Sequence, residues 1–305
     1  MPGDDAPLFG ALPAGHRSGF VAIVGRPNVG KSTLLNALLG RKIAAVTPKP
    51  QTTRRRLLGI KTLDAAQILF VDTPGIHKAR DVMNARMVDH AMASLADPDA
   101  ILFMVDAAAG LKSGDREIAK LLPARPVLIG VNKIDRRERH ELLPLIAELA
   151  SWLPDRPVVP CSARSGENLD ELLRAIVATL PEGPRYYPAD ELTDEPERAV
   201  AAELVREKAM LETRDEIPYE IAVSIDAFEE KPEKNLVVIK ATLHVARDSQ
   251  KPILVGHRGA RVKAIGQAAR RELEAFLGTR VFLELFVRVQ EDWNKHAARL
   301  REFGI

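Results

Sequence analysis

An eight-residue glycine loop constrains this chain more than any other feature of its sequence. Residues 25–32 read Gly-Arg-Pro-Asn-Val-Gly-Lys-Ser, after an apolar run at 20–24 and before a helix-forming run at 33–39. A strand, a glycine loop and a helix start in that order cradle phosphate groups with backbone N–H groups and the helix dipole. The pattern predicts that Lys31 reaches the β- and γ-phosphates and that the Ser32 hydroxyl binds Mg²⁺. We expect triphosphate contacts from Gly25, Arg26, Pro27, Asn28, Val29, Gly30, Lys31, Ser32 and Thr33.

The tetrapeptide Asn-Lys-Ile-Asp at 132–135 predicts which base is bound, because it follows a buried strand pattern about 100 residues after the loop. The Asp135 carboxylate can accept two hydrogen bonds from guanine, whereas adenine would leave it unpaired at a cost of ~1–3 kcal/mol. Asn132 can brace the loop, and the aliphatic stem of Lys133 can lie along the ring. A further strand end at 157–160 leads into Ser162 and Ala163, which complete the expected base site.

A third element, Asp-Thr-Pro-Gly at 72–75, ends another apolar run. A carboxylate at Asp72 can hold Mg²⁺, and Gly75 lacks a Cβ, so its N–H can approach the γ-phosphate closely. The next residue is Ile76, where Ras-like switches carry a glutamine that orients water. A branched alkane cannot orient water, so we expect slow intrinsic hydrolysis. The nucleotide contacts expected here come from Asp72, Thr73, Pro74, Gly75 and Ile76.

Between these elements, the proline-rich segment 44–54 is either a nucleotide-dependent switch or an ordinary polar loop. As a switch it would offer Mg²⁺ and the γ-phosphate a threonine, with Thr53 the first candidate and Thr52 the second. The predicted catalytic set is then Lys31, Thr53 and Gly75, and the predicted Mg²⁺ ligands are Ser32, Thr53 and Asp72.

Composition places few further limits on the chain. With 305 residues, 46% of them apolar, it can form one or two domains with full cores. Its single cysteine, Cys161, excludes an internal disulfide and fits a reducing compartment. No apolar run approaches the ~20 residues that span a bilayer, and the first residues lack the pattern of a signal peptide. We therefore expect a cytoplasmic protein, most simply a monomer.

From 20 to 180, apolar strand patterns alternate with helical patterns, which predicts an α/β domain with a mostly parallel sheet and helices on both faces. Expected strands lie near 20–24, 56–62, 68–72, 99–106, 126–131 and 157–162. Expected helices lie near 31–39, 84–96, 113–122, 138–151 and 168–180. Prolines after 180 end this pattern. We divide the chain into a tail (1–18), a GTP-binding domain (19–181), a linker (182–194) and a smaller α+β domain (195–305).

The last domain has the element order helix, strand, strand, helix, Gly-His-Arg-Gly, helix, strand. Its expected elements are helices at 195–212, 251–255, 260–277 and 294–303 and strands at 217–227, 236–246 and 281–289. The stretch 247–271 holds seven basic residues and one acid, which indicates either a polyanion-binding face or a solvated helix surface. Glycines between two helices let a nucleic-acid backbone approach closely. The predicted RNA-binding residues are Gly256, His257, Arg258, Gly259, Arg261, Lys263 and Arg270.

Together these motifs resemble the Era family of bacterial GTPases, as do Gln-Thr-Thr-Arg at 51–54, Arg-Glu-Lys at 206–208 and Glu-Ile-Pro-Tyr at 216–219. The resemblance implies a P-loop GTPase domain joined to a type II KH domain. It further implies Mg²⁺-dependent GTP hydrolysis, binding to the 3′ end of 16S rRNA and a role in assembly of the 30S ribosomal subunit. Peripheral association with the inner membrane is also implied, as is a K⁺ site at Asn28. The family's KH loop usually reads Gly-Lys-Gly-Gly, so the Gly-His-Arg-Gly of this chain departs from it.

Two other classes share part of the pattern. The tRNA-modifying GTPases have a similar loop asparagine but need an extra catalytic domain, for which this chain has no room. A signalling GTPase that recruits proteins would use the C-terminal domain only as a scaffold, and RNA binding distinguishes it from the leading interpretation.

Overall fold

The computed structural model describes residues 12–75, 83, 87, 97–122 and 125–305. Contacts group the chain into two compact units. The first contains residues 1–40, 56–77 and 91–194, and the second contains residues 41–55, 78–90 and 195–305. The segment 41–55, which contains the predicted switch, therefore packs with the C-terminal unit, although it lies within the range expected for the GTP-binding domain.

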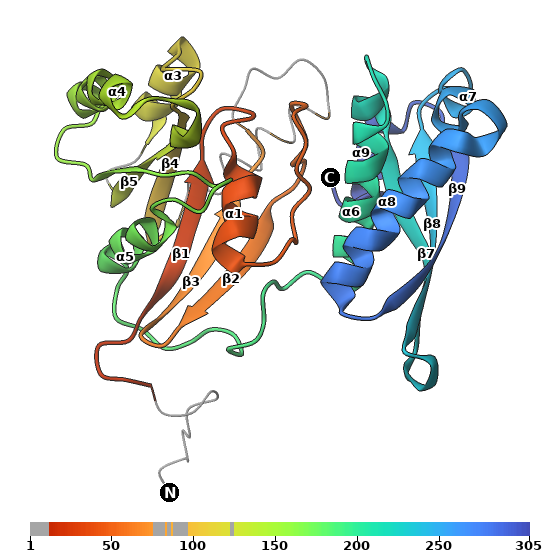
Figure 1. Cartoon of the computed structure of the whole chain (residues 1–305), viewed down its shortest axis with the longest axis horizontal. Helices are drawn as coiled ribbons and strands as arrows, with labels where there is room; N and C mark the ends of the chain where they lie inside the picture. The colour runs from red at the N-terminus through yellow and green to blue at the C-terminus, as the bar shows by residue number, and fades with distance from the viewer. Residues whose placement is uncertain (1–11, 76–82, 84–86, 88–96, 123–124) are drawn as a thin grey trace, which may run out of the picture. The chain divides into compact units, whose positions relative to one another are not determined.

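The first unit is built on a six-stranded sheet of order β2-β3-β1-β4-β5-β6 (Figure 1). Its strands are β1 (Arg17–Val24), β2 (Leu57–Leu63), β3 (Ala66–Asp72), β4 (Ala100–Asp106), β5 (Val127–Asn132) and β6 (Val158–Pro160). All neighbouring pairs are parallel except β2 and β3, which form an antiparallel hairpin. Strands β3, β4 and β5 are buried along their whole length, as expected for strands covered on both faces.

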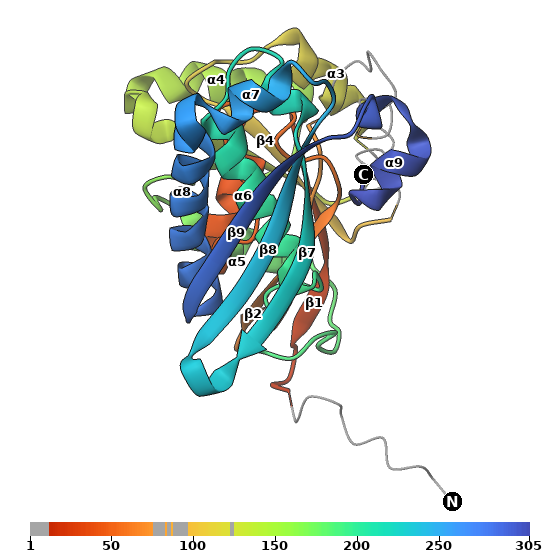
Figure 2. The same cartoon turned by 90° about the vertical axis from the view of Figure 1, so that its right-hand side faces the viewer.

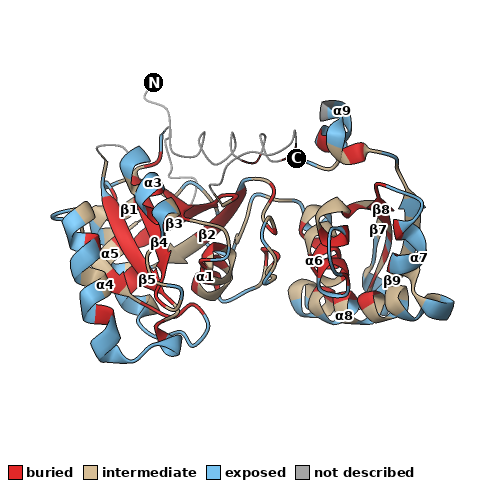
Figure 3. Ribbon diagram, turned by 90° about the horizontal axis from the view of Figure 1, so that it is seen from above, coloured by how far each residue is buried: buried red, intermediate tan, exposed pale blue. Residues whose placement is uncertain are grey.

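Helices cover both faces of this sheet, in agreement with the predicted fold class. They are α1 (Lys31–Leu39), α3 (Ser113–Leu121), α4 (Arg139–Trp152) and α5 (Leu169–Thr179). One core cluster joins the apolar residues of β1, β4 and β5 to Ile118 of α3 and to Leu142 and Leu149 of α4. Figure 3 shows the result, with the central strands buried and the outer faces of α4 and α5 exposed. This core fixes the carboxyl ends of the parallel strands β1, β4 and β5 at one edge of the sheet.

The C-terminal unit contains a three-stranded sheet of order β7-β8-β9, with β8 and β9 parallel (Figure 2). Its strands are β7 (Ala222–Lys231), β8 (Leu236–Val245) and β9 (Arg280–Val289). Its helices are α6 (Glu197–Leu211), α7 (Gln250–Val255), α8 (Ala260–Leu277) and α9 (Ala297–Glu302). The order α-β-β-α-α-β agrees with the order expected from the sequence.

Three boundaries differ from the sequence patterns. Strand β1 begins at Arg17, before the strand start expected at residue 20 and inside the tail expected at 1–18. The strand expected at 217–227 begins only at Ala222, because Pro218 lies in a 3₁₀ turn over Ile217–Glu220. Proline cannot donate a ladder hydrogen bond, so the strand starts after it. The terminal helix is likewise a 3₁₀ turn at Trp293–Lys295 followed by α9. Most of the helix expected at 84–96 lies outside the described residues, as do Ile76 and residues 1–11 of the tail.

Among the described residues, no helix is both long enough and apolar enough to cross a bilayer.

Candidate functional site

The glycine loop connects β1 to α1 and lies beside the end of β5. Gly30 precedes the helix with a φ of 104°, a conformation that L side chains rarely adopt. A Cβ on Gly30 would lie only 2.3 Å from Nδ2 of Asn132. The Asn132 amide in turn donates to the carbonyl of Val29 at 2.9 Å. The loop expected to hold phosphate and the strand expected to hold the base therefore contact each other directly.

Lys31 and Ser32 are the last residues of this loop and the first residues of α1. The Lys31 ammonium is buried and donates to the carbonyls of Gly25 and Arg26, each at 3.2 Å. Burial lowers the pKa of Lys31 to about 8, and the nearby Asp72 carboxylate partly opposes that shift. The side chain thus remains largely protonated at neutral pH and can form an ion pair with a phosphate group.

The Ser32 hydroxyl donates to Oδ2 of Asp72 at 2.6 Å. Asp72 is the last residue of β3 and is fully buried. A hydroxyl and a carboxylate this close together present the hard oxygen donors that Mg²⁺ prefers, so the residues fit the ion that the P-loop pattern implies.

The predicted base site forms a hollow of about 270 Å³ at the ends of β5 and β6. Oδ1 of Asn132 accepts from the backbone N–H of Ala163 at 2.9 Å, which joins the two strand ends. The Ser162 hydroxyl donates to Oδ1 of Asp135 at 2.7 Å and so orients that carboxylate. The residues lining the hollow are Thr33, Asn132, Lys133, Asp135, Arg136, Ala163 and Arg164. The structure brings together all five base-site residues that the sequence predicted.

Lys133 has a role that the sequence did not reveal. Its backbone has a φ of 67°, and its ammonium donates to the carbonyl of Asn28 at 2.6 Å and to Oδ2 of Asp106 at 2.5 Å. Asp106 ends β4, at the same sheet edge as Asp72 and Asn132. A carboxylate at the end of a buried strand was the available signal. It predicted a role for Asp72, and Asp106 has the same position at the end of β4.

A second unpredicted contact holds the loop from outside. Nε of Arg26 lies 2.8 Å from Oδ1 of Asp115, which is completely buried at the start of α3. The Asp115 carboxylate also caps its own helix by accepting from the N–H of Lys112 at 2.9 Å. Removal of Arg26 would leave the buried Asp115 carboxylate without its opposite charge, so the pair favours this position of the loop.

The remaining predicted nucleotide contacts divide between the two units. In the first unit, the Thr73 hydroxyl donates to the carbonyl of Ile23 at 2.9 Å. A Cβ on Gly75 would meet the backbone nitrogen of Pro27 at 2.7 Å, so this glycine lies against the loop. In the C-terminal unit, the Thr52 hydroxyl lies 2.7 Å from that of Thr47 and donates to the carbonyl of Lys49 at 2.8 Å. Thr53 is half-buried in the same unit.

The predicted RNA loop is a tight turn between α7 and α8. Gly256, Arg258 and Gly259 have φ values of 76°, 48° and 78°. The side chains of His257, Arg258, Lys263 and Arg270 are exposed, whereas Arg261 folds back to donate to the carbonyl of Ile253. The turn therefore presents basic side chains to solvent on either side of an open glycine.

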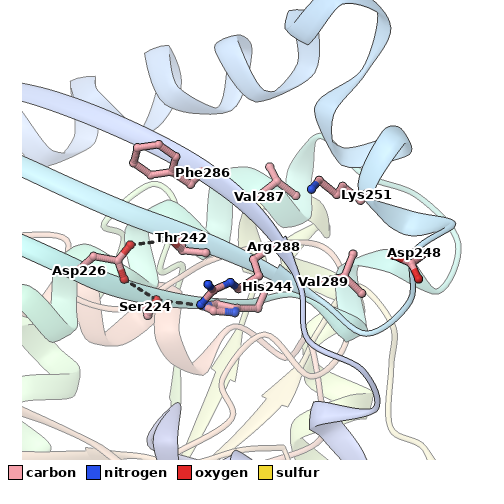
Figure 4. A pocket seen from close by; sticks show the side chains of 10 residues that line it. All are labelled: Ser224, Asp226, Thr242, His244, Asp248, Lys251, Phe286, Val287, Arg288 and Val289. Atoms are coloured by element: carbon pink, nitrogen blue, oxygen red, sulfur yellow. Dashed lines mark hydrogen bonds between the residues drawn. The ribbon is translucent and has the colours of Figure 1, made fainter.

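A separate hollow of about 660 Å³ lies on the outer face of the C-terminal sheet (Figure 4). On its floor, the Ser224 hydroxyl donates to Asp226 at 3.0 Å and lies 2.9 Å from Nε2 of His244, while Thr242 donates to Asp226 at 2.6 Å. Desolvation lowers the pKa of His244. Since Asp226 binds the serine rather than the histidine, the arrangement does not form a nucleophilic relay. Lys251, Phe286 and Arg288 line the same hollow.

Comparison with known proteins agrees with this geometry. The family model described as a 50S ribosome-binding GTPase matches residues 20–133, and the KH domain model matches residues 216–294. GTPase Era of Geobacter metallireducens is 49% identical over 290 residues, which cover 94% of this chain and 97% of that protein. GTPase Era of Heliobacterium modesticaldum is 46% identical over 290 residues, with the same coverage of both chains.

Two crystal structures of Era superpose closely. An Era variant of Aquifex aeolicus bound to GDP·AlF4⁻ has a TM-score of 0.90 and 46% identity, over 94% of this chain and 99% of that one. Era in complex with MgGDPNP and nucleotides 1506–1542 of 16S ribosomal RNA has a TM-score of 0.90 and 47% identity, over 95% and 99%.

Fold and site together define a P-loop GTPase joined to a KH domain. Identity at this level over almost the whole chain also settles the particular family. The chain belongs to the Era family of GTPases and hydrolyses GTP.

Proposed function

We propose that this chain is a GTP-controlled switch that binds the 3′ end region of 16S rRNA and acts in assembly of the 30S ribosomal subunit. The observation that carries the proposal is the presence in one chain of a guanine-type base pocket and an open basic turn between two helices. The related Era that binds nucleotides 1506–1542 of 16S rRNA supports it at 47% identity.

In this proposal the nucleotide site works by position and charge rather than by covalent chemistry. Lys31 holds the β- and γ-phosphates, while Asp135 reads the base from a carboxylate oriented by Ser162. Ser32, Asp72 and Thr53 would hold Mg²⁺, which would neutralise the charge of the phosphates. Gly75 and Thr53 would sense the γ-phosphate. We further propose that the K⁺ site at Asn28 compensates for the apolar Ile76 and that unassisted hydrolysis is slow.

The RNA would lie on the turn at 256–259, with its phosphates near Arg258, Lys263 and Arg270. Exposed Phe286, together with Lys251 and Arg288 in the neighbouring hollow, could extend that surface for an unstacked base. We propose a cytoplasmic location, with peripheral association at the inner membrane, and a monomeric form.

The test is filter binding of the full chain to a single-stranded 16S 3′-end RNA, with GDP or with a non-hydrolysable GTP analogue. Gly259→Asp places a carboxylate on the turn and should weaken RNA binding by about tenfold or more, because it repels the phosphates. Gly278→Asp is a matched control, because both glycines have a φ near 70° to 80° and open space where a Cβ would lie. Equal RNA affinity of the two variants would contradict the proposed RNA surface, and absence of RNA binding in both nucleotide states would favour a signalling GTPase.

A further inference from the structure

We propose that the KH-domain unit itself holds the predicted nucleotide switch. The positioning residues that connect the two are Lys49, Arg54, Arg206 and Glu207. In this view the segment 41–55 moves with the C-terminal unit and places Thr53 for the γ-phosphate. The inference rests on the proposed function, since it explains how nucleotide state would reach the RNA-binding surface.

Arg206, on α6, forms a hydrogen bond with the backbone of the predicted switch. Its guanidinium donates to the carbonyl of Thr52 at 2.5 Å, although only 3% of the residue is exposed. The same guanidinium binds Glu203, with Nε donating to Oε1 at 2.9 Å. Fixed at both ends, this side chain ties the residue directly before Thr53 to α6.

Glu207, the next residue on α6, holds the segment at a second point. Its Oε2 accepts from the backbone N–H of Val46 at 2.8 Å, and its Oε1 accepts from Lys42 at 2.7 Å. Only 1% of Glu207 is exposed, and Lys208 donates to the same Oε1 at 2.8 Å. A buried carboxylate satisfied by two lysines and a backbone N–H forms a fixed anchor.

Arg54 forms the third contact, in which a side chain of the segment donates to backbone carbonyls of the C-terminal unit. This residue of the segment is 2% exposed and donates to three carbonyls that follow one another closely in the C-terminal unit. The acceptors are Ile221 at 2.7 Å, Tyr219 at 2.9 Å and Pro218 at 3.2 Å. Burial, reinforced by the positive charge of Arg206, lowers the pKa of Arg54 to about 9, so the guanidinium still carries its charge at pH 7.

Lys49 adds a fourth contact that is closer to the surface. Its ammonium donates to the carbonyls of Met210 and Thr213, at the end of α6.

Thr53 thus lies between two residues that contact the C-terminal unit: the carbonyl of Thr52 accepts from Arg206, and the side chain of Arg54 donates to backbone carbonyls. Displacement of Thr53 relative to α6 would strain several charge-assisted hydrogen bonds together, so binding of Thr53 to a γ-phosphate would act on the whole unit.

The same contacts explain two sequence signatures that carry no evident chemistry of their own. Arg-Glu-Lys at 206–208 supplies the two α6 anchors, and Glu-Ile-Pro-Tyr at 216–219 supplies two of the carbonyls that accept from Arg54. Their spacing fits a receptor for the segment 41–55.

The experiment compares the RNA affinity of the full chain with GDP and with a non-hydrolysable GTP analogue, and uses the ratio of the two dissociation constants. A coupled wild type should show a ratio on the order of 5 to 150. We expect Arg54→Met to bring the ratio to within about twofold of 1, and Lys49→Met to lower it at least threefold. Lys49→Arg should restore it, because arginine can donate to the same carbonyls. Lys120→Met, at an exposed position of α3, is the control.

The measured ratios distinguish failure of the inference from failure of the proposed function. A wild-type ratio of 1 contradicts nucleotide-controlled RNA binding itself. A wild-type ratio above 5 that Lys49→Met leaves unchanged overturns the inference alone, even if Arg54→Met fails to fold. Hydrogen exchange provides an independent test. Glu207→Met removes the acceptor of the Val46 N–H and should speed exchange of that amide by about tenfold or more in the GDP state, and an unchanged rate also overturns the inference.

Discussion

The nucleotide site and the basic turn differ in how far their polar side chains are buried and bound by the rest of the protein. At the nucleotide site, Lys31, Asp72 and Asn132 are buried, and their polar atoms already bind other parts of the protein. At the turn, His257 and Arg258 extend into solvent. Under the proposed function, the first site selects its ligand by preformed geometry, whereas the second attracts its ligand by charge. Substitutions should therefore cause large, specific losses at the first and small, salt-dependent losses at the second.

The largest expected effect comes from Lys31→Ala. Loss of a buried cation at the phosphates should lower kcat/KM for GTP by on the order of 10³. Phosphate release at several GTP concentrations measures it, with Lys120→Ala as the control at an exposed lysine. A loss below tenfold would show that the site is less preformed than its burial indicates.

Asp135→Asn should weaken GTP binding by about 100-fold, because two hydrogen bonds to a charged acceptor are lost. The new amide can donate to the extra carbonyl of xanthine, so xanthosine triphosphate should become the better ligand. Fluorescence competition measures both affinities, with Asp64→Asn, an exposed aspartate between β2 and β3, as the control. Retained preference for GTP would refute the assignment of the base pocket.

Two glycines of the turn should differ in stability cost. A Cβ on Gly256 would lie 2.9 Å from the backbone nitrogen of Arg261, whereas nothing lies within 4 Å of one on Gly259. We expect Gly256→Ala to lower the free energy of unfolding by about 2–3 kcal/mol and Gly259→Ala by about 1 kcal/mol. Urea unfolding in a Trp152→Phe background reports on Trp293, the remaining tryptophan. Equal costs would mean that the turn adapts.

Lys263→Ala should have the smallest effect, a loss of RNA affinity of a few-fold at moderate salt. The slope of log affinity against log salt concentration should fall by about 0.7, the contribution of one phosphate contact with a single strand. Lys234→Ala, at an exposed lysine between β7 and β8 of the same unit, should leave the slope unchanged. A slope unaffected by Lys263→Ala would place the RNA elsewhere.

Sequence patterns predicted the fold class well because the informative features are local. Apolar runs end in polar residues at Asp72 and Asn132, and parallel strands must bring those ends to one edge. Helix α1 ends as expected at Gly40, whose φ of 70° closes the last turn. Such signals depend on neighbours in the chain and need no tertiary information.

The missed contacts all depend on residues far apart in sequence. Asp115 binds Arg26 across 89 positions, and Glu207 binds Val46 across 161. A buried acid on a helix has the same sequence pattern as a solvated acid, so nothing in the sequence near Glu207 indicated its buried contacts with the segment 41–55. The expected start of β7 at Ile217 was wrong for a more local reason, since Pro218 lies in a 3₁₀ turn and the strand begins at Ala222.

The lysine that follows β5 has a consequence for how this molecule could change over time. Lys133 joins the carbonyl of Asn28 to the carboxylate of Asp106, and its neighbour Asn132 donates to the carbonyl of Val29. Recognition of the ligand's two ends therefore depends on the same contacts. A lineage that drifted toward another purine would have to repair the triphosphate end at the same moment. Ligand choice in such an architecture should shift by rare, concerted jumps and resist gradual retuning.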